Sequence, residues 1–463
     1  MTLIKNSDKL TACGDAALRG LALEIAEESV EFANPGNAVR RQVRLEGRRL
    51  VVGATSFELG VGRVFVIGAG KATFPIAKAL EEVLGEFLYR GLVVCKHGQE
   101  GSLERIEMLQ AAHPLPDANS VDGARKTVEL LREVRAEDMV IACFTGGSSS
   151  LFVLPAGDIG LDDKARASEL LLTCGANIVE INDVRKHLSI VKGGRLVRNL
   201  PRGTRLLNLT VSDVIGDALD YITDPSYPDE STFASAAAVL SKYELWGRMP
   251  HSVVAHLRRA APEQETATAQ QLAHLERTDV LLLSADAACR AAADAARARG
   301  FTPVLLSTLF EGDSGMLGKN FVAIAKQIMR DGHPVMPPCA LIGGGETTVI
   351  TNGARGRGGP NQEFAVAAAL DLHEHPGIVV LGIDTDGTDG PTPYAGGLAD
   401  AETLNVAAAR GIDLHAALRM HDVSTALHAI DHHIVTGNTG TNVNDLKLAL
   451  IAAQPTESSQ SRS

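Results

Sequence analysis

The sequence is poor in aromatic residues, which make up 4% of its 463 residues and include a single tryptophan. Proteins that bind single-stranded nucleic acid use aromatic side chains as stacking platforms, so this scarcity disfavours that class. Basic residues are also in deficit, because 44 lysines and arginines face 56 aspartates and glutamates, for a formal net charge of -12. This charge opposes general binding to phosphate backbones. We therefore expect no nucleic-acid partner, and any phosphate that the protein binds should be small and locally held.

The six cysteines are widely scattered, and no Cys-x-x-Cys pair occurs among them. This pattern predicts reduced core cysteines in a cytoplasmic protein and disfavours a structural zinc site. The N-terminal stretch lacks the apolar core of a signal sequence, and no apolar run is long enough to cross a bilayer. We expect no membrane partner.

What the sequence does have is length, together with alternating strand and helix patterns. A chain of 463 residues is longer than a single core usually supports. The alternation predicts an α/β fold with two domains, each built on a mostly parallel sheet covered by helices. We place a Rossmann-like N-terminal domain at 1–265, a C-terminal α/β domain at 266–453 and a frayed polar tail at 454–463.

The central pattern is residues 64–80, where an apolar run leads through glycines to Lys71 and a helical stretch. A helix that begins just beyond glycines can bind phosphate with its backbone N–H groups, and Lys71 would add a cation. Neither the P-loop nor the dinucleotide fingerprint fits, because Ala72 follows the lysine and Thr73 and Phe74 stand where a third small residue is needed. A glycine turn that serves only packing remains the alternative.

Two further glycine-rich loops, at 145–150 and 343–348, also follow apolar strand patterns. Such loops can form backbone nests for anions, and in open α/β sheets ligands bind at the carboxyl ends of strands. The candidate nucleotide-binding residues are Gly68, Gly70, Gly146, Gly147, Ser148, Ser149, Gly343, Gly344, Gly345 and Glu346.

Carboxylates cluster in the segment 384–390, where Asp384, Asp386 and Asp389 follow a strand pattern. The glutamate of a calcium loop is missing, whereas Mg²⁺ needs only one or two carboxylates together with substrate phosphates. Asp213, which follows the strand pattern at 205–211, is a further metal and catalytic candidate, with a helix cap as the alternative. We predict Mg²⁺ at Asp213 or at the 384–389 loop.

Basic residues gather in two places. The segment 162–197 has a helical pattern, and Arg185 and Lys192 are seven residues apart, which would put them on one helix face. A solvated face and an anion site explain this cluster equally well. Arg357 lies in the glycine-rich segment 353–363, which suits a charge clamp over phosphate or a surface hairpin. Nests, cations and clustered carboxylates are together the parts of a phosphoryl-transfer site, so the residues predict a kinase.

The motifs also match a known family. The chain resembles the class II glycerate 2-kinases, which carry a C-terminal MOFRL-type domain, over nearly its whole length. The motifs that carry the resemblance are GAGKA (68–72), HPLPD (113–117), TGGSSSL (145–151), NDVRKHLSIVKGG (182–194), SDVIGD (212–217), GGGETTV (343–349), GRGGPNQE (356–363), GIDTDGTDGPT (382–392) and TGNTGTNVND (436–445).

The resemblance implies ATP- and magnesium-dependent phosphorylation of D-glycerate at its 2-hydroxyl, in a cleft between two α/β domains. It puts the catalytic lysine on Lys71 and the catalytic arginine on Arg357, with Arg355 as the other choice. By analogy, Lys186, His187, Lys192 and Asn361 would bind the substrate. An NAD(P)H-dependent hydroxypyruvate reductase is the runner-up, and the resemblance leaves open whether two chains pair as a homodimer.

Overall fold

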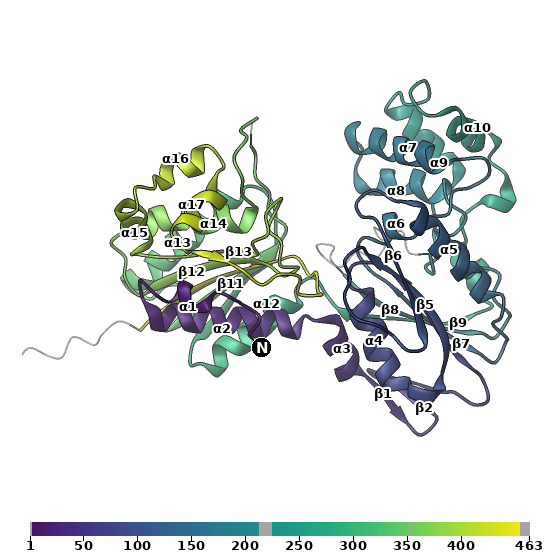
Figure 1. Ribbon diagram of the computed structural model, residues 1–463, viewed down its shortest axis with the longest axis horizontal. Helices are drawn as coiled ribbons and strands as arrows, with labels where there is room; N and C mark the ends of the chain where they lie inside the picture. The colour runs from purple at the N-terminus through teal and green to yellow at the C-terminus, as the bar shows by residue number, and fades with distance from the viewer. Residues whose placement is uncertain (1, 213–224, 352, 454–463) are drawn as a thin grey trace, which may run out of the picture. The chain divides into compact units, whose positions relative to one another are not determined.

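The structure, a computed structural model, describes residues 2–212, 225–351 and 353–453 (Figure 1). These residues form two compact units. Unit 1 holds the described parts of 1–34 and 283–463, and unit 2 holds those of 35–212 and 218–282. Asp213, predicted as a catalytic and metal-binding residue, lies outside the described residues.

Unit 2 is built on a six-stranded sheet in the order β6-β5-β4-β7-β8-β9. The pairs β6–β5, β5–β4, β4–β7 and β7–β8 are all parallel, as the sequence predicts. The apolar run at 64–67 lies in β4, every residue of which is buried. The strands are β4 (Val64–Ala69), β5 (Leu88–Lys96), β6 (Ile106–Ala111), β7 (Met139–Phe144), β8 (Arg205–Val211) and β9 (Glu276–Leu283).

Helices cover this sheet because alternate residues of its strands point to opposite faces. On one face, Phe65, Ile67 and Val94 pack with apolar residues of α5, while α4 also contacts β4, β5 and β7. A separate apolar cluster holds α7 to α10 together. The helices of unit 2 include α3 (Pro35–Gln42), α4 (Thr73–Leu84), α5 (Ala118–Leu131), α6 (Ser148–Leu151), α7 (Leu161–Thr173), α8 (Ile178–His187), α9 (Phe233–Lys242), α10 (His251–Arg259) and α11 (Ala269–Leu272). A small antiparallel sheet is formed by β1 (Val43–Glu46), β2 (Arg49–Val52) and β3 (Thr55–Glu58).

Unit 1 has a six-stranded sheet in the order β10-β11-β15-β12-β13-β14. The pair β10–β11 is parallel, and the other four pairs are antiparallel. It follows that β10, β11, β12 and β14 run in one direction, whereas β15 and β13 lie between them and run in the opposite direction. The strands are β10 (Thr302–Phe310), β11 (Cys339–Gly345), β12 (Ile378–Asp384), β13 (Gly396–Asp400), β14 (His433–Ile434) and β15 (Asp445–Ile451).

Both faces of this sheet are covered by helices (Figure 1). Ala340 and Ile342 of β11 pack in one cluster with α2 and α12, while Cys339 and Leu341 pack in another with α13 and α14. The alternation gives the sheet two buried faces, which explains why its strands read as continuous apolar runs. The helices are α1 (Ser7–Leu10), α2 (Ala16–Phe32), α12 (Ala287–Ala298), α13 (Ser314–Asp331), α14 (Pro360–Leu372), α15 (Thr403–Ala409), α16 (Leu414–Arg419) and α17 (Val423–Ala429).

The two units differ from the predicted boundary at 265/266. Residues up to 34 belong to unit 1, because α2 packs against α12 and against β12 and β15. The strand at 276–283 belongs to the sheet of unit 2 beside β8, although the sequence pattern assigned it to the C-terminal domain. Contacts between segments distant in sequence, helix packing in the first case and strand pairing in the second, decided these assignments, and a local sequence pattern does not specify such contacts.

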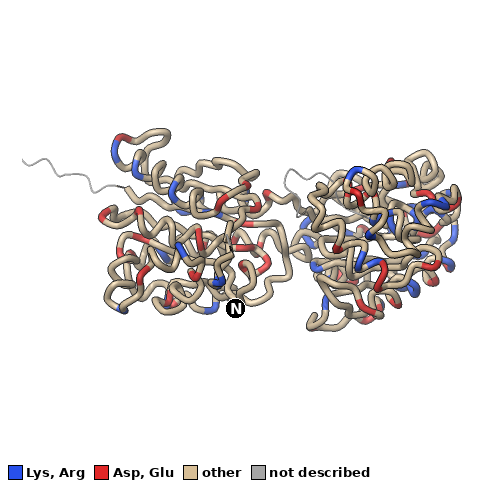
Figure 2. Tube along the Cα trace, turned by 90° about the horizontal axis from the view of Figure 1, so that it is seen from above, with Lys and Arg blue, Asp and Glu red and all other residues tan. Residues whose placement is uncertain are grey.

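Charged residues of both signs are interspersed along both units (Figure 2). None of the described helices combines the length and the apolar character that a membrane crossing requires.

Candidate active site

The loop between β4 and α4 is bound tightly to the loop after β7. The Lys71 N–H donates to the carbonyl oxygen of Gly146 (2.9 Å), the Ala72 N–H to Thr145 Oγ1 (3.2 Å), and the Gly70 N–H to the Val94 carbonyl (3.2 Å). These donors are therefore satisfied within the protein and are not directed at a ligand. This corrects the prediction of an open backbone nest at this loop.

The glycines of this loop serve close packing. A Cβ on Gly68 would lie 2.4 Å from the Cys143 carbonyl oxygen, and one on Gly70 would lie 2.1 Å from Thr145 Oγ1. Any larger residue would push β4 away from β7. The alternative reading of these glycines, a turn needed for strand-to-helix packing, is what the structure shows.

The loop after β7 has a different character. Gly147 adopts φ +86°, a left-handed conformation that glycine reaches without strain. Among the described residues, the N–H groups of Gly146 and Gly147 have no hydrogen-bond partner, whereas that of Ser148 donates to the Thr145 carbonyl (3.1 Å). Ser149 is half-buried and Ser148 is buried. Of the two loops, this one keeps backbone donors available for an anion.

Lys71 and His113 meet at this loop. A Cβ on Gly147 would be 3.2 Å from both Lys71 Cγ and His113 Nε2, so a larger residue there would crowd the two side chains. Burial, together with the charges of Lys71 and Lys96, lowers the pKa of His113 to about 4. The imidazole is therefore neutral at physiological pH and adds no charge beside Lys71.

The basic segment after Thr173 is not one continuous helix. α8 is capped by Asn177 and Glu180, ends at His187, and is followed by turns that contain Lys192. The prediction that Arg185 and Lys192 share a helix face was therefore wrong. Both side chains nevertheless line the same cavity, because the chain turns back after α8.

Two predicted substrate ligands in this segment are engaged by carboxylates. Lys186 Nζ lies 2.5 Å from Asp229 Oδ1, and both side chains are buried. His187 Nε2 lies 2.5 Å from Glu265 Oε1, and its Nδ1 lies 2.7 Å from the Asp183 carbonyl. Burial alone would raise the pKa of Asp229, but the charge and hydrogen bond of Lys186 outweigh it and lower that pKa. The structure therefore gives Lys186 and His187 structural partners.

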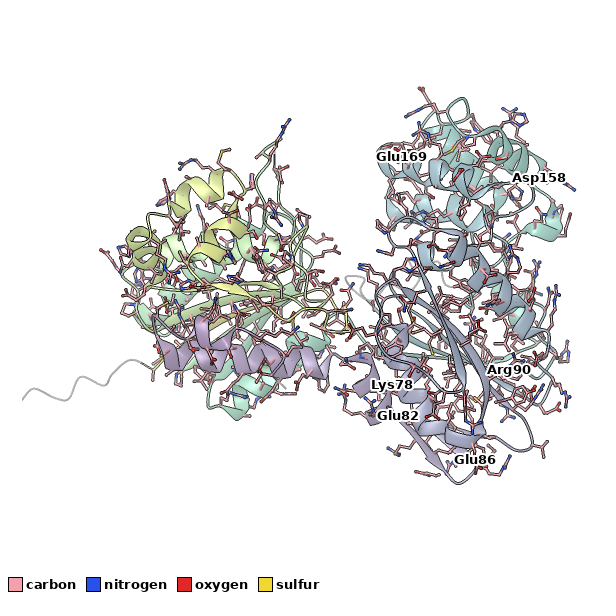
Figure 3. The ribbon with its side chains drawn as sticks, in the orientation of Figure 1. Lys78, Glu82, Glu86, Arg90, Asp158 and Glu169 are labelled. Atoms are coloured by element: carbon pink, nitrogen blue, oxygen red, sulfur yellow. The ribbon has the colours of Figure 1, made fainter. Side chains whose placement is uncertain are left out.

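A cavity of about 390 Å³ lies between α7, α8 and the segment at 113–116. Its lining is mostly apolar, but Lys164, Arg185 and Lys192 all reach it, together with Ser149 and Ser150. Glu169, labelled on α7 in Figure 3, is a further lining residue. Of these three cations, Lys164 was not among the residues that the sequence analysis singled out.

In unit 1, the three glycines at the end of β11 are strand residues. Gly343, Gly344 and Gly345 are buried and paired with β15, and Gly343 and Gly345 are also paired with β10. A Cβ on Gly344 would be 2.4 Å from Cys289 Sγ, and one on Gly345 would be 2.2 Å from the Phe310 carbonyl oxygen. The predicted anion nest is thus replaced by a close-packed strand end, after which Glu346 is exposed.

Asp389 and Asn361 form a buried connection at the start of α14. The Asp389 carboxylate accepts hydrogen bonds from the backbone N–H groups of Asn361 (3.0 Å) and Gln362 (2.9 Å) and from both side-chain amides. Asn361 also donates to Asp445 (2.7 Å) and accepts from Lys447 (2.5 Å). These bonds use the atoms that the sequence analysis had assigned to metal and substrate, so both residues hold the N-terminus of α14 instead.

Asp384 and Asp386 remain as candidate magnesium ligands. Asp384 stands opposite Asp445 in the register of β12 and β15. Burial, with the charges of Asp386 and Asp445, raises the pKa of Asp384 well above its ordinary value. A bound cation would relieve this repulsion, so the donor set fits Mg²⁺. Among the described residues no three acidic, histidine or cysteine side chains gather as a metal cage.

Arg357 combines a fixed backbone with an exposed side chain. Its N–H donates to Asp422 Oδ1 (3.1 Å), and its carbonyl accepts from the Ser424 N–H (2.9 Å). A Cβ on Gly356 would be 2.2 Å from the Met420 carbonyl oxygen, so this segment is packed against the turn before α17 rather than acting as a hinge. The backbone of Arg357 is therefore held at a defined place on unit 1, and its side chain is exposed there.

The sequence analysis missed three charged residues: Lys164, Asp445 and Lys447. Lys164 occupies the apolar face of α7, in line with Ala167 and Leu171, and Lys447 stands in the wholly buried strand β15. The sequence signal for these residues was a charged side chain within an apolar stripe. Burying a charge has a high energetic cost, so such a residue is expected to have a function or a partner.

Taken together, unit 2 presents Lys71 and a cationic cavity, and unit 1 presents Arg357 and an acidic strand end, on α/β scaffolds. Cations and carboxylates of this kind are typical of proteins that bind anionic, phosphorylated ligands.

Comparison with known proteins gives the family. Residues 21–258 match the model described as domain of unknown function DUF4147, and residues 339–445 match the MOFRL family. The chain is 37% identical over 439 residues to a glycerate 2-kinase of Pyrococcus horikoshii, covering 94% of this chain and 98% of the relative. The crystal structure of a glycerate kinase from Thermotoga maritima superposes with a TM-score of 0.83 at 36% identity, covering 94% of this chain and all of that one. An Agrobacterium vitis protein with the provisional name hydroxypyruvate reductase is 38% identical over 394 residues.

The chain therefore belongs to the glycerate kinase family, with a DUF4147 region followed by a MOFRL region.

Proposed function

We propose that this protein is a glycerate 2-kinase, which transfers the γ-phosphoryl group of ATP to the 2-hydroxyl of D-glycerate. The observation that carries the proposal is its 37% identity, over 94% of its length, to a protein named glycerate 2-kinase. The cationic side chains of unit 2 and the acidic strand end of unit 1 support it, because phosphoryl transfer depends on cations that neutralise phosphate and on a bound metal ion.

Phosphoryl transfer has a loose transition state, so positioning and charge stabilisation matter more than a strong base. We propose that Lys71 neutralises the charge on the transferring phosphoryl group and that Gly146 and Gly147 bind phosphate oxygens through their backbone N–H groups. Arg357 is proposed as the second cation. Asp384 and Asp386 would hold Mg²⁺, which supplies further neutralisation of phosphate charge when bound.

Lys71 is tested by Lys71→Ala, with Lys78→Ala as the matched control. Lys78 lies two helical turns further along, exposed on α4 (Figure 3). We expect Lys71→Ala to lower kcat by about a thousandfold, the scale on which a cation at the transferring phosphoryl group acts, with an unchanged circular dichroism spectrum. Lys78→Ala should behave as wild type. Normal turnover in Lys71→Ala would refute the assignment.

The activity itself is tested by incubating the protein with D-glycerate and Mg-ATP and identifying the product by phosphorus NMR. A parallel reaction with hydroxypyruvate and NADH is followed at the nicotinamide absorbance. We expect 2-phosphoglycerate in the first reaction and no NADH oxidation in the second. NADH oxidation without phosphorylation would establish the reductase instead.

One structural observation weighs against the reductase. Dinucleotide folds bind pyrophosphate on free N–H groups at the first helix N-terminus. Here the N–H groups of Gly70, Lys71 and Ala72 are bonded within the protein, and β5 ends in Lys96 where the ribose-binding acid would stand.

A further inference from the structure

The cavity in unit 2 contains two buried or half-buried cations that the protein does not neutralise. Lys164 is 4% exposed, and Arg185 is half-buried on α8. Across the described residues, neither side chain makes a hydrogen bond or an ion pair, in contrast to Lys186 and His187 beside them. Unpaired charges in such surroundings lower stability, so their presence points to an anion that joins them.

The surroundings of Lys164 are positive as well as apolar. Burial, followed by the charges of Arg185 and Arg195, lowers the pKa of its ammonium group to about 7. Arg195 donates to the carbonyl oxygens of Lys192, Gln264 and Lys186, and within the described part of the chain its guanidinium forms no ion pair. The one carboxylate on the lining, Glu169, pairs with Arg166 at the surface (2.6 Å).

The same cavity borders the phosphoryl-transfer residues. His113 lies on its lining, and the space a Cβ on Gly147 would occupy is 3.2 Å from His113 Nε2 and from Lys71 Cγ. Ser149, which follows the available N–H groups of the β7 loop, also lies on the lining. A molecule bound in the cavity would thus have one end among the cations and the other near Lys71.

We propose that Arg185 and Lys164 bind the carboxylate of the hydroxy acid that is phosphorylated, and that this contact selects acids over neutral polyols. The inference rests on the proposed kinase function and names the acceptor subsite within it. Arg185 contributes a planar guanidinium that matches a carboxylate with two hydrogen bonds, and Lys164 adds a point charge.

A carboxylate suits this place better than the nucleotide phosphates. A carboxylate carries one negative charge and can be bound by Arg185 and Lys164 together, whereas a triphosphate carries several negative charges and needs Mg²⁺. The apolar walls formed by Pro114, Val153 and Leu172 suit the carbon chain of a small acid. The volume of about 390 Å³ holds a three-carbon acid together with water.

The test compares Arg185→Gln and Lys164→Met with Arg90→Gln, a surface arginine paired with Glu133 (Figure 3). Loss of a charge-assisted hydrogen bond should raise the KM for D-glycerate roughly 10- to 100-fold, leaving the KM for ATP within about twofold. The preference for D-glycerate over glycerol should shrink by a similar factor. Arg90→Gln should match wild type in every measurement.

Calorimetric titration with D-glycerate in the absence of ATP separates this inference from the proposed function. Glycerate binding that is lost in Arg185→Gln supports the subsite even if wild type shows no kinase activity. A weakened KM for ATP with an unchanged KM for glycerate would overturn it and assign the cations to phosphate. Glycerate affinity that is unchanged in both variants would also overturn it.

Lys164→Met keeps the inference testable if Arg185→Gln fails to fold. Replacing a buried unpaired ammonium by an apolar side chain of similar length should not lower the melting temperature. Weaker glycerate binding in a variant at least as stable as wild type is the signature of a ligand-binding lysine, and a purely structural lysine would not give it.

Discussion

Lys186 Nζ lies 2.5 Å from Asp229 Oδ1, and this buried pair connects α8 to the segment before α9. Asp229 also accepts from Ser231, and its backbone N–H donates to the Ala267 carbonyl (2.9 Å). The pair therefore holds the scaffold on which the neighbouring Arg185 is displayed. Of two neighbouring basic residues, Lys186 therefore stabilises the fold, whereas Arg185 faces the cavity.

Breaking this pair on one side should be costly. Lys186→Met leaves the Asp229 charge buried and unpaired, and we expect a loss of about 3–5 kcal/mol in the free energy of unfolding. The double variant Lys186→Met with Asp229→Leu should recover most of that stability. Urea denaturation of the single and double variants measures the coupling. A double variant with a normal KM for glycerate shows that the pair is structural, whereas an increased KM in a stable double variant would return Lys186 to the substrate site.

Gly147→Ala tests the meeting of Lys71 and His113. An added Cβ would lie 3.1 Å from His113 Cδ2 and 3.2 Å from Lys71 Cγ, on a backbone with φ +86°. We expect kcat to fall by about tenfold or more, since a displacement of 1 Å at a reacting group can cost a hundredfold. Steady-state kinetics gives the result. Gly160→Ala, which has open space around it and an ordinary φ, should be active, and equal activity of both variants would contradict the prediction.

Substitutions of Asp389 and Asp386 should have different effects: the first should lower stability, and the second should weaken magnesium binding. Asp389→Ala removes the acceptor of four hydrogen bonds at the start of α14, and we expect the protein to lose about 2–4 kcal/mol of stability. Asp386→Ala should lose less, because its carboxylate accepts from the exposed Thr388 and is half-buried, whereas that of Asp389 is buried. It should instead raise the Mg²⁺ concentration needed for half-maximal activity. Thermal unfolding and a magnesium titration of both variants check this, and the reverse pattern would refute it.

Lys164 gives stability a pH dependence with a defined sign. Its pKa is lowered to about 7 in the folded protein, so between pH 7 and its unfolded value near 10.5 the folded state binds fewer protons than the unfolded state. Stability relative to Lys164→Met should therefore rise with pH, by about 2 kcal/mol between pH 7 and pH 9. Denaturation of both proteins at the two pH values gives this difference. A stability difference that does not change with pH would contradict the lowered pKa of Lys164.

The sequence by itself determined the local elements around the site. Apolar runs that end in glycine produced β4 and β7, and the sequence placed Lys71 directly after the first of them, because a strand, a glycine turn and a helix are each specified by neighbouring residues. The family followed from motifs in order along the chain. These features depend on interactions over a few residues.

Only the tertiary structure decided what each glycine and charge does. The backbone N–H of Lys71 donates to Gly146, some 75 positions away, and that of Gly70 donates to Val94 in β5. Gly344 packs closely against Cys289. Lys164 and Arg185 meet because α7 and α8 fold over one cavity, whereas Lys186, one residue further along, finds a carboxylate. Whether a donor or a charge is satisfied depends on partners brought in from distant segments, and local sequence does not encode them.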